Sequence, residues 1–171
     1  RQRWRTIIDS PTGEERSGGL GVGPLGAIRV AVPSDERDLS VGGKELRDQP
    51  TAASRHAHLL FLHPAGGQLR NDRLLGDATA NGSSMEAHDL DVDFAGNTYV
   101  AVSFTGGYQL KDVTQNGQED AAVVAVDALG EPMRFVDSNG SSRAEGLTVA
   151  AADRELQVLV GGMQGTTPEF F

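Results

Sequence analysis

An internal repeat constrains the fold of this chain more than any other feature of its sequence. Its clearest copy is the stretch 87–104, in which apolar residues alternate with aspartates over 89–94. A period of two is typical of a β-strand with two different faces. Residues 93–97 (DFAGN) have the Asp, Gly and Asn that favour a tight turn, and Thr98–Phe104 is rich in β-branched and aromatic residues. The stretch therefore predicts a β-hairpin.

The same unit recurs along the chain. Leu147-x-Val149 matches Leu90-x-Val92, and Leu20-x-Val22 is a third copy. Between the hairpins lies another predicted strand pair, whose first strands are Ala57–Leu62 (AHLLFL) and Ala121–Val126 (AAVVAV). Each unit therefore reads as four antiparallel strands, A to D, over roughly 60 residues, longer than the ~40–50 residues of familiar propeller repeats.

The third strand of each unit, strand C, is apolar on both faces, as AHLLFL and AAVVAV show. Such a strand needs both faces of its sheet covered. Radially stacked blades provide this cover, because each blade buries both faces against its neighbours. We therefore predict an all-β chain, a β-propeller segment with about two complete four-stranded antiparallel blades and parts of two flanking blades. Residues 1–75 hold strand D of a preceding blade and a first blade, 76–137 the second, and 138–171 part of a third.

These residues resemble a known family. The pattern DxxGN followed by YVAVSF, with DAAVVAVDALGEPMRF after it, is similar to the bacterial β-propeller repeats called SBBP (seven-bladed β-propeller repeats). The resemblance covers most of the chain outside its long loops. It departs at Gly23-Pro24-Leu25-Gly26, which stands in place of DxxG, and at Asp153-Arg154-Glu155, which has no turn glycine. The resemblance implies an exported or cell-surface bacterial protein.

The two ends of the sequence fall inside predicted blades. Arg1–Asp9 begins in a strand D, and Pro168–Phe171 stops where a strand C should begin. We therefore expect an internal segment of a larger propeller, whose remaining blades are its partners. The alternative is a short chain that closes a ring by oligomerisation, since unclosed blades expose apolar faces and strand edges.

Composition limits the classes of function. The chain of 171 residues carries a net charge of −9, which argues against nucleic acid and anionic membranes as partners. The absence of cysteine excludes disulfides and cysteine-based metal or haem sites. No apolar run approaches the ~18 residues of a membrane span.

Strand alternation places the A–B and C–D turns on one rim and the B–C and D–A connections on the other. The first rim has tight turns, whereas the second has long loops, including Pro33–His56 and Thr105–Glu119. Long loops on a rigid scaffold commonly carry recognition, so we expect an unknown protein or glycan ligand on this rim. The alternative is that these loops are solvated insertions. The candidate binding residues, among which Tyr108 is expected to be an exposed aromatic, are Tyr108, Lys111, Asn116, Arg37 and Arg47.

Asp89 and Asp91 are candidate ligands for a metal ion, and no other cofactor is expected. They share one face of a strand, and the matching positions Gly21 and Thr148 carry no charge. Oxygen ligands of this kind favour Ca²⁺. The alternative is that the acids meet water or basic residues of a neighbouring blade, while Asp93 caps a turn.

Two further sequence patterns resemble functional motifs but lack the structural context that these motifs need. Residues 21–26 match GxGxxG, but a strand rather than a helix follows, so we interpret them as an A–B turn. His88 with the nearby Ser83 and Ser84 forms a conceivable nucleophile set without a GxSxG elbow. We therefore predict a non-enzymatic binding or display scaffold. The alternatives are a propeller enzyme, such as a metal-assisted hydrolase or lyase acting in the central channel, and a lectin-like ring of short chains.

Overall fold

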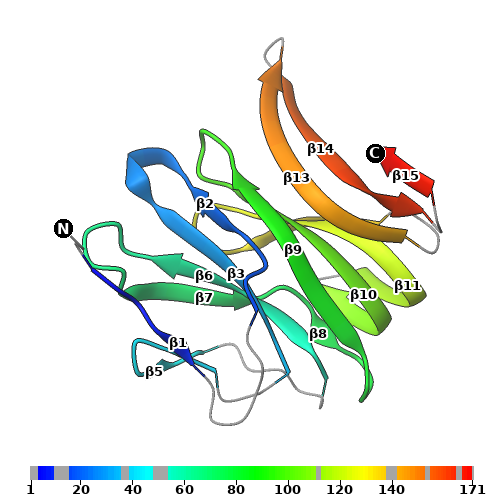
Figure 1. Ribbon diagram of the computed structural model, residues 1–171, viewed down its shortest axis with the longest axis horizontal. Helices are drawn as coiled ribbons and strands as arrows, with labels where there is room; N and C mark the ends of the chain where they lie inside the picture. The colour runs from blue at the N-terminus through cyan, green and yellow to red at the C-terminus, as the bar shows by residue number, and fades with distance from the viewer. Residues whose placement is uncertain are drawn as a thin grey trace.

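The computed structural model describes residues 4–9, 16–35, 39–47, 54–110, 113–137, 142–152, 155–164 and 167–170. These residues form an all-β structure whose one helical element is the single 3₁₀ turn Pro24–Gly26. The prediction of an all-β chain is therefore confirmed. The strands group into four separate antiparallel sheets, and the N-terminal and C-terminal sheets lie at opposite ends of the molecule (Figure 1).

Two of the sheets are meanders, in which antiparallel strands joined by consecutive connections pair in chain order. The first meander runs β2-β3-β6-β7, formed by Leu20–Val22, Ile28–Ser34, His56–Leu62 and Leu69–Leu74. The second meander runs β9-β10-β11-β12, formed by Ser84–Val92, Thr98–Leu110, Val113–Val126 and Pro132–Asp137. The short strand β8 (Asp77–Ala78) also pairs with the far end of β10. The strand order is the predicted A to D order.

A smaller sheet lies at each end of this pair. The N-terminal sheet contains β1 (Ile8–Asp9), β4 (Ser40–Val41) and β5 (Lys44–Glu45). The C-terminal sheet contains β13 (Ser142–Ala152), β14 (Glu155–Gln164) and β15 (Thr167–Phe170). Strands β4 and β5 lie inside the stretch Pro33–His56, which the sequence presented as a loop without strands.

The two meanders share the same register, which shows that the sequence repeat is a structural repeat. Leu20 pairs with Val30 in the first, as Leu90 pairs with Val100 in the second. The ladder between strands C and D shifts register next to Leu62 in the first and next to Val126 in the second. These shifts fall at equivalent positions, directly before the C–D turn.

The tight turns repeat as well. In the turn 93–97, the Asp93 N–H donates to Asn97 O at 2.9 Å and the Gly96 N–H donates to Asp93 O at 3.0 Å. The turns 127–131 and 23–27 have the same two backbone hydrogen bonds at the same spacing. The fourth position of each is a glycine with positive φ, between 75° and 99°. The GxGxxG match is thus a hairpin turn, as predicted.

The first meander packs face to face on β9 of the second (Figure 1). The largest apolar cluster lies between them and contains Leu59 and Phe61 of β6 together with Leu90, Val100 and Phe104 of the second meander. All seven residues of β6 are buried. Both faces of this strand are therefore covered, the outer one by Leu39 and Val41 beside the N-terminal sheet and the inner one by the second meander.

Glycines of the first hairpin allow this packing to be close. A Cβ atom added at Gly21 of β2 would lie 2.5 Å from Leu90 Cδ1, and one added at Gly23 would lie 2.7 Å from Val92 Cγ1. A side chain at either position would force Leu90 or Val92 to shift, so the two glycines allow β2 and β9 to pack closely.

A second set of contacts links the outer strand of one unit to the C–D turn of the next. In β7, Asn71 Nδ2 donates to Leu129 O at 3.2 Å and Arg73 Nε donates to Gly130 O at 2.6 Å. Arg73 also forms an ion pair with Glu131. The turn 127–131 therefore rests on the outer strand of the first meander.

The preceding segment makes the equivalent contacts with the turn of the first meander. Trp4 Nε1 donates to Pro64 O at 3.1 Å, and Thr6 Oγ donates to Gly67 O at 2.6 Å. Gly67 and Gly130 are the positive-φ glycines of their turns. Residues 4–9 thus contact the turn of the first meander as β7 contacts the turn of the second, and the interpretation of this segment as strand D of a preceding blade stays a prediction.

One loop expectation is wrong. The stretch Thr105–Glu119 is not a loop, because β10 and β11 continue as a paired ladder to Leu110 and Val113. A bulge next to Gly106, whose φ is +83°, lets the ladder continue past the Gly-Gly pair. The sequence pattern concealed this extension because glycine and polar residues replace the alternating apolar pattern.

Candidate functional site

Arg55 lies at the centre of a group of ion pairs on the predicted rim that carries the B–C and D–A connections, which we call the long-loop rim. Its guanidinium forms an ion pair with Glu86 at 2.7 Å and a longer one with Asp35 at 3.7 Å, and Glu86 is also 3.7 Å from Arg16. The Arg55 backbone joins the two meanders, because its N–H donates to Ser83 O and its carbonyl accepts from the Met85 N–H. The rim is thus held by a mixed-charge network that no sequence motif marked.

Tyr108 lies under this network, and the prediction that it is exposed is wrong. Its side chain is 2 % exposed, and its hydroxyl donates to Arg55 O at 2.5 Å. Burial raises its pKa above the ordinary value. The correction follows from the extended β10–β11 ladder, which places Tyr108 in a strand packed edge to face against Phe104. Tyr108 therefore supports the rim from inside and cannot stack on a ligand at the surface.

The structure describes two of the other four predicted binding residues. Arg47 is exposed, and its backbone N–H donates to the buried Asp72 carboxylate at 2.8 Å. Asn116 lies in β11, opposite Gly107. Arg37 and Lys111 lie outside the described residues. A binding role for these four residues stays a prediction.

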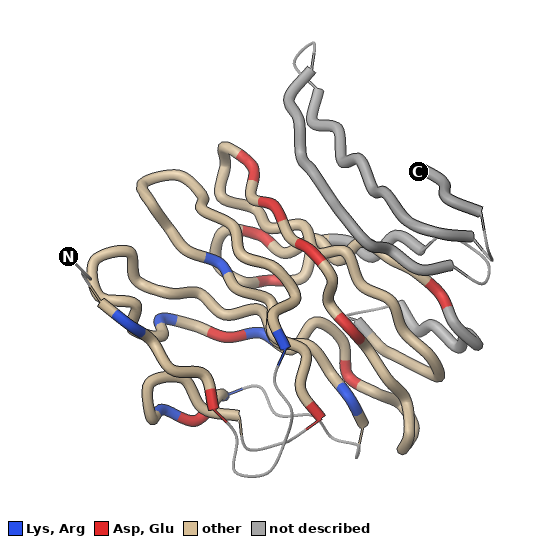
Figure 2. The backbone as a smooth tube through the Cα atoms, in the orientation of Figure 1, with Lys and Arg blue, Asp and Glu red and all other residues tan. Residues whose placement is uncertain are grey.

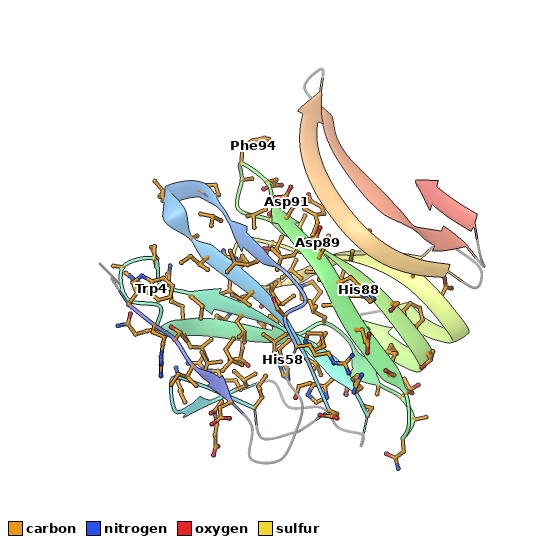
Figure 3. All side chains as sticks on the ribbon, in the orientation of Figure 1. Trp4, His58, His88, Asp89, Asp91 and Phe94 are labelled. Carbon is orange, nitrogen blue, oxygen red and sulfur yellow. The ribbon has the colours of Figure 1, made fainter. Side chains whose placement is uncertain are left out.

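Carboxylates follow β9 along its length, as Figure 2 shows. Asp89 and Asp91 are half-buried, and each accepts a hydrogen bond from the N–H of the next residue, at 2.9 Å and 2.8 Å. With His88 they succeed one another along the strand, and Phe94 lies at the tip of the hairpin (Figure 3). Within the described residues, no group of three or more His, Asp or Glu side chains is placed to hold a metal ion.

The calcium site at Asp89 and Asp91 stays a prediction. Ca²⁺ prefers six to eight oxygen ligands, so two carboxylates need further ligands from elsewhere. Calorimetric titration of Ca²⁺ into wild type and into Asp91→Asn tests it. Binding that the substitution removes supports the site, and identical flat traces contradict it.

His88 has a different partner from the one the sequence suggested. Its Nε2 lies 2.6 Å from Ser103 Oγ on the neighbouring strand. Ser83, in contrast, is buried and its carbonyl accepts from the Arg55 N–H. The geometry therefore couples His88 to Ser103 across the β9–β10 ladder, next to a register shift of β9.

Asp93 caps its turn, as the structural alternative stated. One carboxylate oxygen accepts from the Ala95 and Asn97 N–H groups at 2.9 Å and 2.8 Å. The other accepts from Asn97 Nδ2 at 2.8 Å and from the Tyr99 hydroxyl at 3.3 Å. Burial and the neighbouring Asp93 raise the pKa of Tyr99. Asp93 is committed to the turn and is not part of a ligand site.

Two histidines form a buried pair that sequence reasoning did not single out as important. His56 and His58 of β6 are fully buried, with ring centroids 4.9 Å apart in an edge-to-face arrangement. His56 Nδ1 lies 3.0 Å from Ser54 O, whereas neither ring nitrogen of His58 has a hydrogen-bond partner among the described residues. Burial, and to a lesser degree His56, lowers the pKa of His58 to about 3. The His58 ring is therefore neutral at neutral pH.

Three of the tight turns carry an exposed apolar side chain. Strand alternation does not predict this exposure, because the residues lie in turns. Leu25, Phe94 and Leu129 are at least 78 % exposed, each at the tip of a turn. Their rim, which we call the short-turn rim, carries the turns 23–27, 63–67, 93–97 and 127–131. The two turns of each meander lie together there, since Gly26 is close to Pro64 and Gly96 is close to Ala128.

Comparisons with known proteins give no further identification. No protein-family model matches the sequence, and no curated protein matches it either. Among the described residues, none of the helical structure has the length and apolarity needed to cross a membrane.

Proposed function

We propose that the stacked meanders are blades of a β-propeller built from SBBP-like repeats, and that the chain is a non-enzymatic binding or display scaffold. In this proposal it is a segment of a larger exported or cell-surface bacterial protein. Its ligand, a protein or a glycan, binds on the long-loop rim.

The repeated contact between an outer strand and the next C–D turn carries the proposal. Arg73 donates to Gly130 O and Thr6 donates to Gly67 O, so a contact between an outer segment and a C–D turn occurs twice along the chain. A relation that repeats with the same geometry generates a regular array of units. When each unit is a four-stranded meander with both faces covered, a radial array of blades satisfies it.

The rims differ in what they offer a ligand. The long-loop rim combines the charged network of Arg16, Asp35, Arg55 and Glu86 with exposed Arg47. Mixed charges in loops on a rigid sheet favour recognition of a polar surface, such as a protein or a glycan. Loop surfaces of this kind bind without chemistry unless they also hold a nucleophile, a base and an electrophilic group in one place.

A binding screen with matched rim variants tests the proposal. Immobilised glycans and surface proteins would be probed with wild type, with Asp35→Ala/Arg47→Ala on the long-loop rim, and with Leu25→Ser/Phe94→Ser on the short-turn rim. All four side chains are exposed, so each variant keeps its core. We expect the long-loop variant to lose binding and the short-turn variant to keep it. The reverse pattern contradicts the assignment of the rim, and turnover of a screened compound contradicts the non-enzymatic assignment.

A further inference from the structure

Arg29 of β3 is a buried cation without a counter-charge among the described residues. Its side chain is 6 % exposed, and it pairs across the strands with Phe61, so both lie on the face that packs against the second meander. The chain has 24 acidic residues, yet none that the structure describes forms an ion pair with Arg29. Buried charges are normally paired, because an unpaired charge in an apolar interior is costly. The place of the counter-charge is therefore open to a ligand.

The guanidinium of Arg29 has one edge that no described residue occupies. Its Nη1 donates to Ile28 O at 3.4 Å, and its central carbon lies 4.2 Å from the centroid of the Phe61 ring, a cation–π contact. Nε is buried without a hydrogen bond, and Nη2 has no partner in the described structure either. Nε and Nη2 lie side by side on the planar group and carry two parallel N–H donors. An edge of this kind matches the two oxygens of a carboxylate.

A second arginine lies beside Phe61 on the other side. Strand β6 lies between β3 and β7, and Phe61 pairs with Arg29 on one side and with Asn71 on the other. The register shift next to Phe61 leaves Arg70 as the extra residue of β7, and its side chain is exposed. Burial, and then the positive charge of Arg70, lowers the pKa of Arg29. Arg29 thus has a like charge nearby.

The acids of the C–D turn that rests on β7 are engaged elsewhere. Glu131 forms an ion pair with Arg73. Asp127 accepts hydrogen bonds from the N–H groups of Leu129 and Glu131 in its own turn. Neither carboxylate forms an ion pair with Arg29, although the turn packs on the same face of the first meander. The two positive charges therefore stay together without neutralisation by this turn.

We propose that Arg29 and Arg70 form a binding site for a carboxylate ligand at the short-turn end of the seam between the two meanders. The Nε–Nη2 edge of Arg29 holds the two carboxylate oxygens, and the exposed Arg70 adds a second positive charge from the solvent side. The carboxylate belongs to a sugar acid or to the acidic side chain of a peptide, which present the same planar group. Arg29 follows the turn 23–27 and Phe61 precedes the turn 63–67, so this site is separate from the ligand proposed for the long-loop rim.

Nuclear magnetic resonance titration with sodium glucuronate tests the site. In isotope-labelled wild type, the Nε–Hε resonance of Arg29 should shift as glucuronate is added and should reach a plateau. Sodium chloride at the same ionic strength is the control, and it should produce no saturable shift. A resonance that does not respond to glucuronate, or that responds equally to chloride, overturns the proposal.

Three substitutions separate the two arginines from a general effect of charge, with binding followed at the backbone N–H of Phe61. Arg29→Met removes the paired donors and should abolish saturable binding. Arg70→Gln changes an exposed side chain and keeps the core, and it should raise the dissociation constant about tenfold, the loss expected for one charge-assisted contact. Lys44→Gln is the matched control, because Lys44 is an exposed cation on β5, and it should bind as wild type does. Equal affinities of Arg70→Gln and Lys44→Gln would overturn the site.

Two further probes identify the source of the carboxylate. Tighter binding of glucuronate than of N-acetylglutamate assigns the site to a sugar acid, and the reverse order assigns it to an acidic side chain of a peptide. Either order supports a carboxylate site. Tighter binding of inorganic phosphate than of both would overturn the selection of a planar carboxylate. The rim variants Asp35→Ala/Arg47→Ala should bind these probes as wild type does, so failure of this site and failure of the long-loop rim are distinguishable.

Discussion

At the scale of single residues, one aspartate decides the geometry of the central hairpin. Asp93 accepts four hydrogen bonds from its own turn and from Tyr99, whereas Asp127 in the equivalent C–D turn accepts two backbone bonds, from Leu129 and Glu131. The two turns share a backbone conformation, so the difference between the two carboxylates lies in their burial. Asp93 is buried, and Asp127 is half-buried.

We therefore expect Asp93→Ala to cost more stability than Asp127→Ala. A buried hydrogen-bonded charge contributes about 1.5–3 kcal/mol, and its removal also leaves the buried Tyr99 hydroxyl without this partner. Replacement of a capping side chain at a more exposed turn costs about 0.5–2 kcal/mol. Urea unfolding of both variants gives the comparison. Equal losses would show that the buried network around Asp93 contributes nothing.

The buried His58 predicts a specific dependence of stability on pH. Its folded pKa, about 3, lies below the ordinary value of 6.5, so the folded state requires the neutral ring. The stability that depends on the neutral His58 ring is fully retained above pH 6.5. It decreases as the pH falls from about 6.5 towards 3, because the unfolded state then binds a proton that the folded state does not. Near pH 4.5 the loss is about 2–3 kcal/mol.

Replacement of the titrating ring should reduce that slope. Unfolding of His58→Leu, followed from neutral to acidic pH, should show a weaker loss of stability than wild type. His63→Leu is the control, because His63 is an exposed turn residue. If His58→Leu and wild type lose stability in parallel between pH 6.5 and 4.5, the ring does not control the acid response.

At the scale of elements, strands and tight turns could be predicted from the sequence. The extension of the β10–β11 ladder and the burial of residues in it could not. Residues 98–104 and 121–126 have the apolar and β-branched pattern of strands and lie in β10 and β11. The continuation of this ladder to Leu110 and Val113 depends on pairing between two polar segments, which leaves no periodic signal. For the same reason the burial of Tyr108 could not be predicted, since its hydroxyl bonds to the carbonyl of Arg55, which directly precedes β6 of the first meander.

The close approach of β2 to β9 predicts that a single methyl group destabilises the fold. In Gly21→Ala the new Cβ would lie 2.5 Å from Leu90 Cδ1 and 3.0 Å from Val92 Cγ2, so the packed side chains must shift. Overpacking of this kind costs about 1–3 kcal/mol. Gly76→Ala is the matched control, because its Cβ would meet only the flexible end of Met85 at 3.0 Å and Tyr108 at 3.5 Å among side chains. Thermal unfolding that ranks Gly76→Ala as the more damaging change would contradict the close packing of the two strands.

The contact between β7 and the turn 127–131 is expected to keep that turn closed. Arg73→Ala removes the hydrogen bond to Gly130 and the ion pair with Glu131, so the turn 127–131 should open more often. We expect faster amide hydrogen exchange in this turn, while the turn 93–97, whose backbone hydrogen bonds lie within the turn, should exchange as in wild type. Unchanged exchange at 127–131 would show that this link does not hold the turn.

At the scale of the whole molecule, a chain with a repeat of four strands forms two meanders that bury β6 on both faces. The repeat, the strand order and the tight turns were readable because each depends on local alternation and turn chemistry. The candidate site was not, because its network at Arg55, Glu86 and Asp35 joins residues from three separate segments. The periodicity of the sequence predicts which face of a strand is buried. It does not predict which charged side chains from separate segments form ion pairs.

The two meanders stack face to face with β2 against β9, and nuclear Overhauser effects measure this contact directly. In isotope-labelled wild type, the α-protons of Gly21 should show strong effects to the Leu90 methyl groups, and those of Gly23 to the Val92 methyl groups. Added Cβ atoms at these glycines would lie 2.5 Å and 2.7 Å from the corresponding methyl carbons, so the α-protons lie close to these methyl groups. The absence of these effects, with Leu90 and Val92 methyl groups in contact with water, would contradict the stacked arrangement.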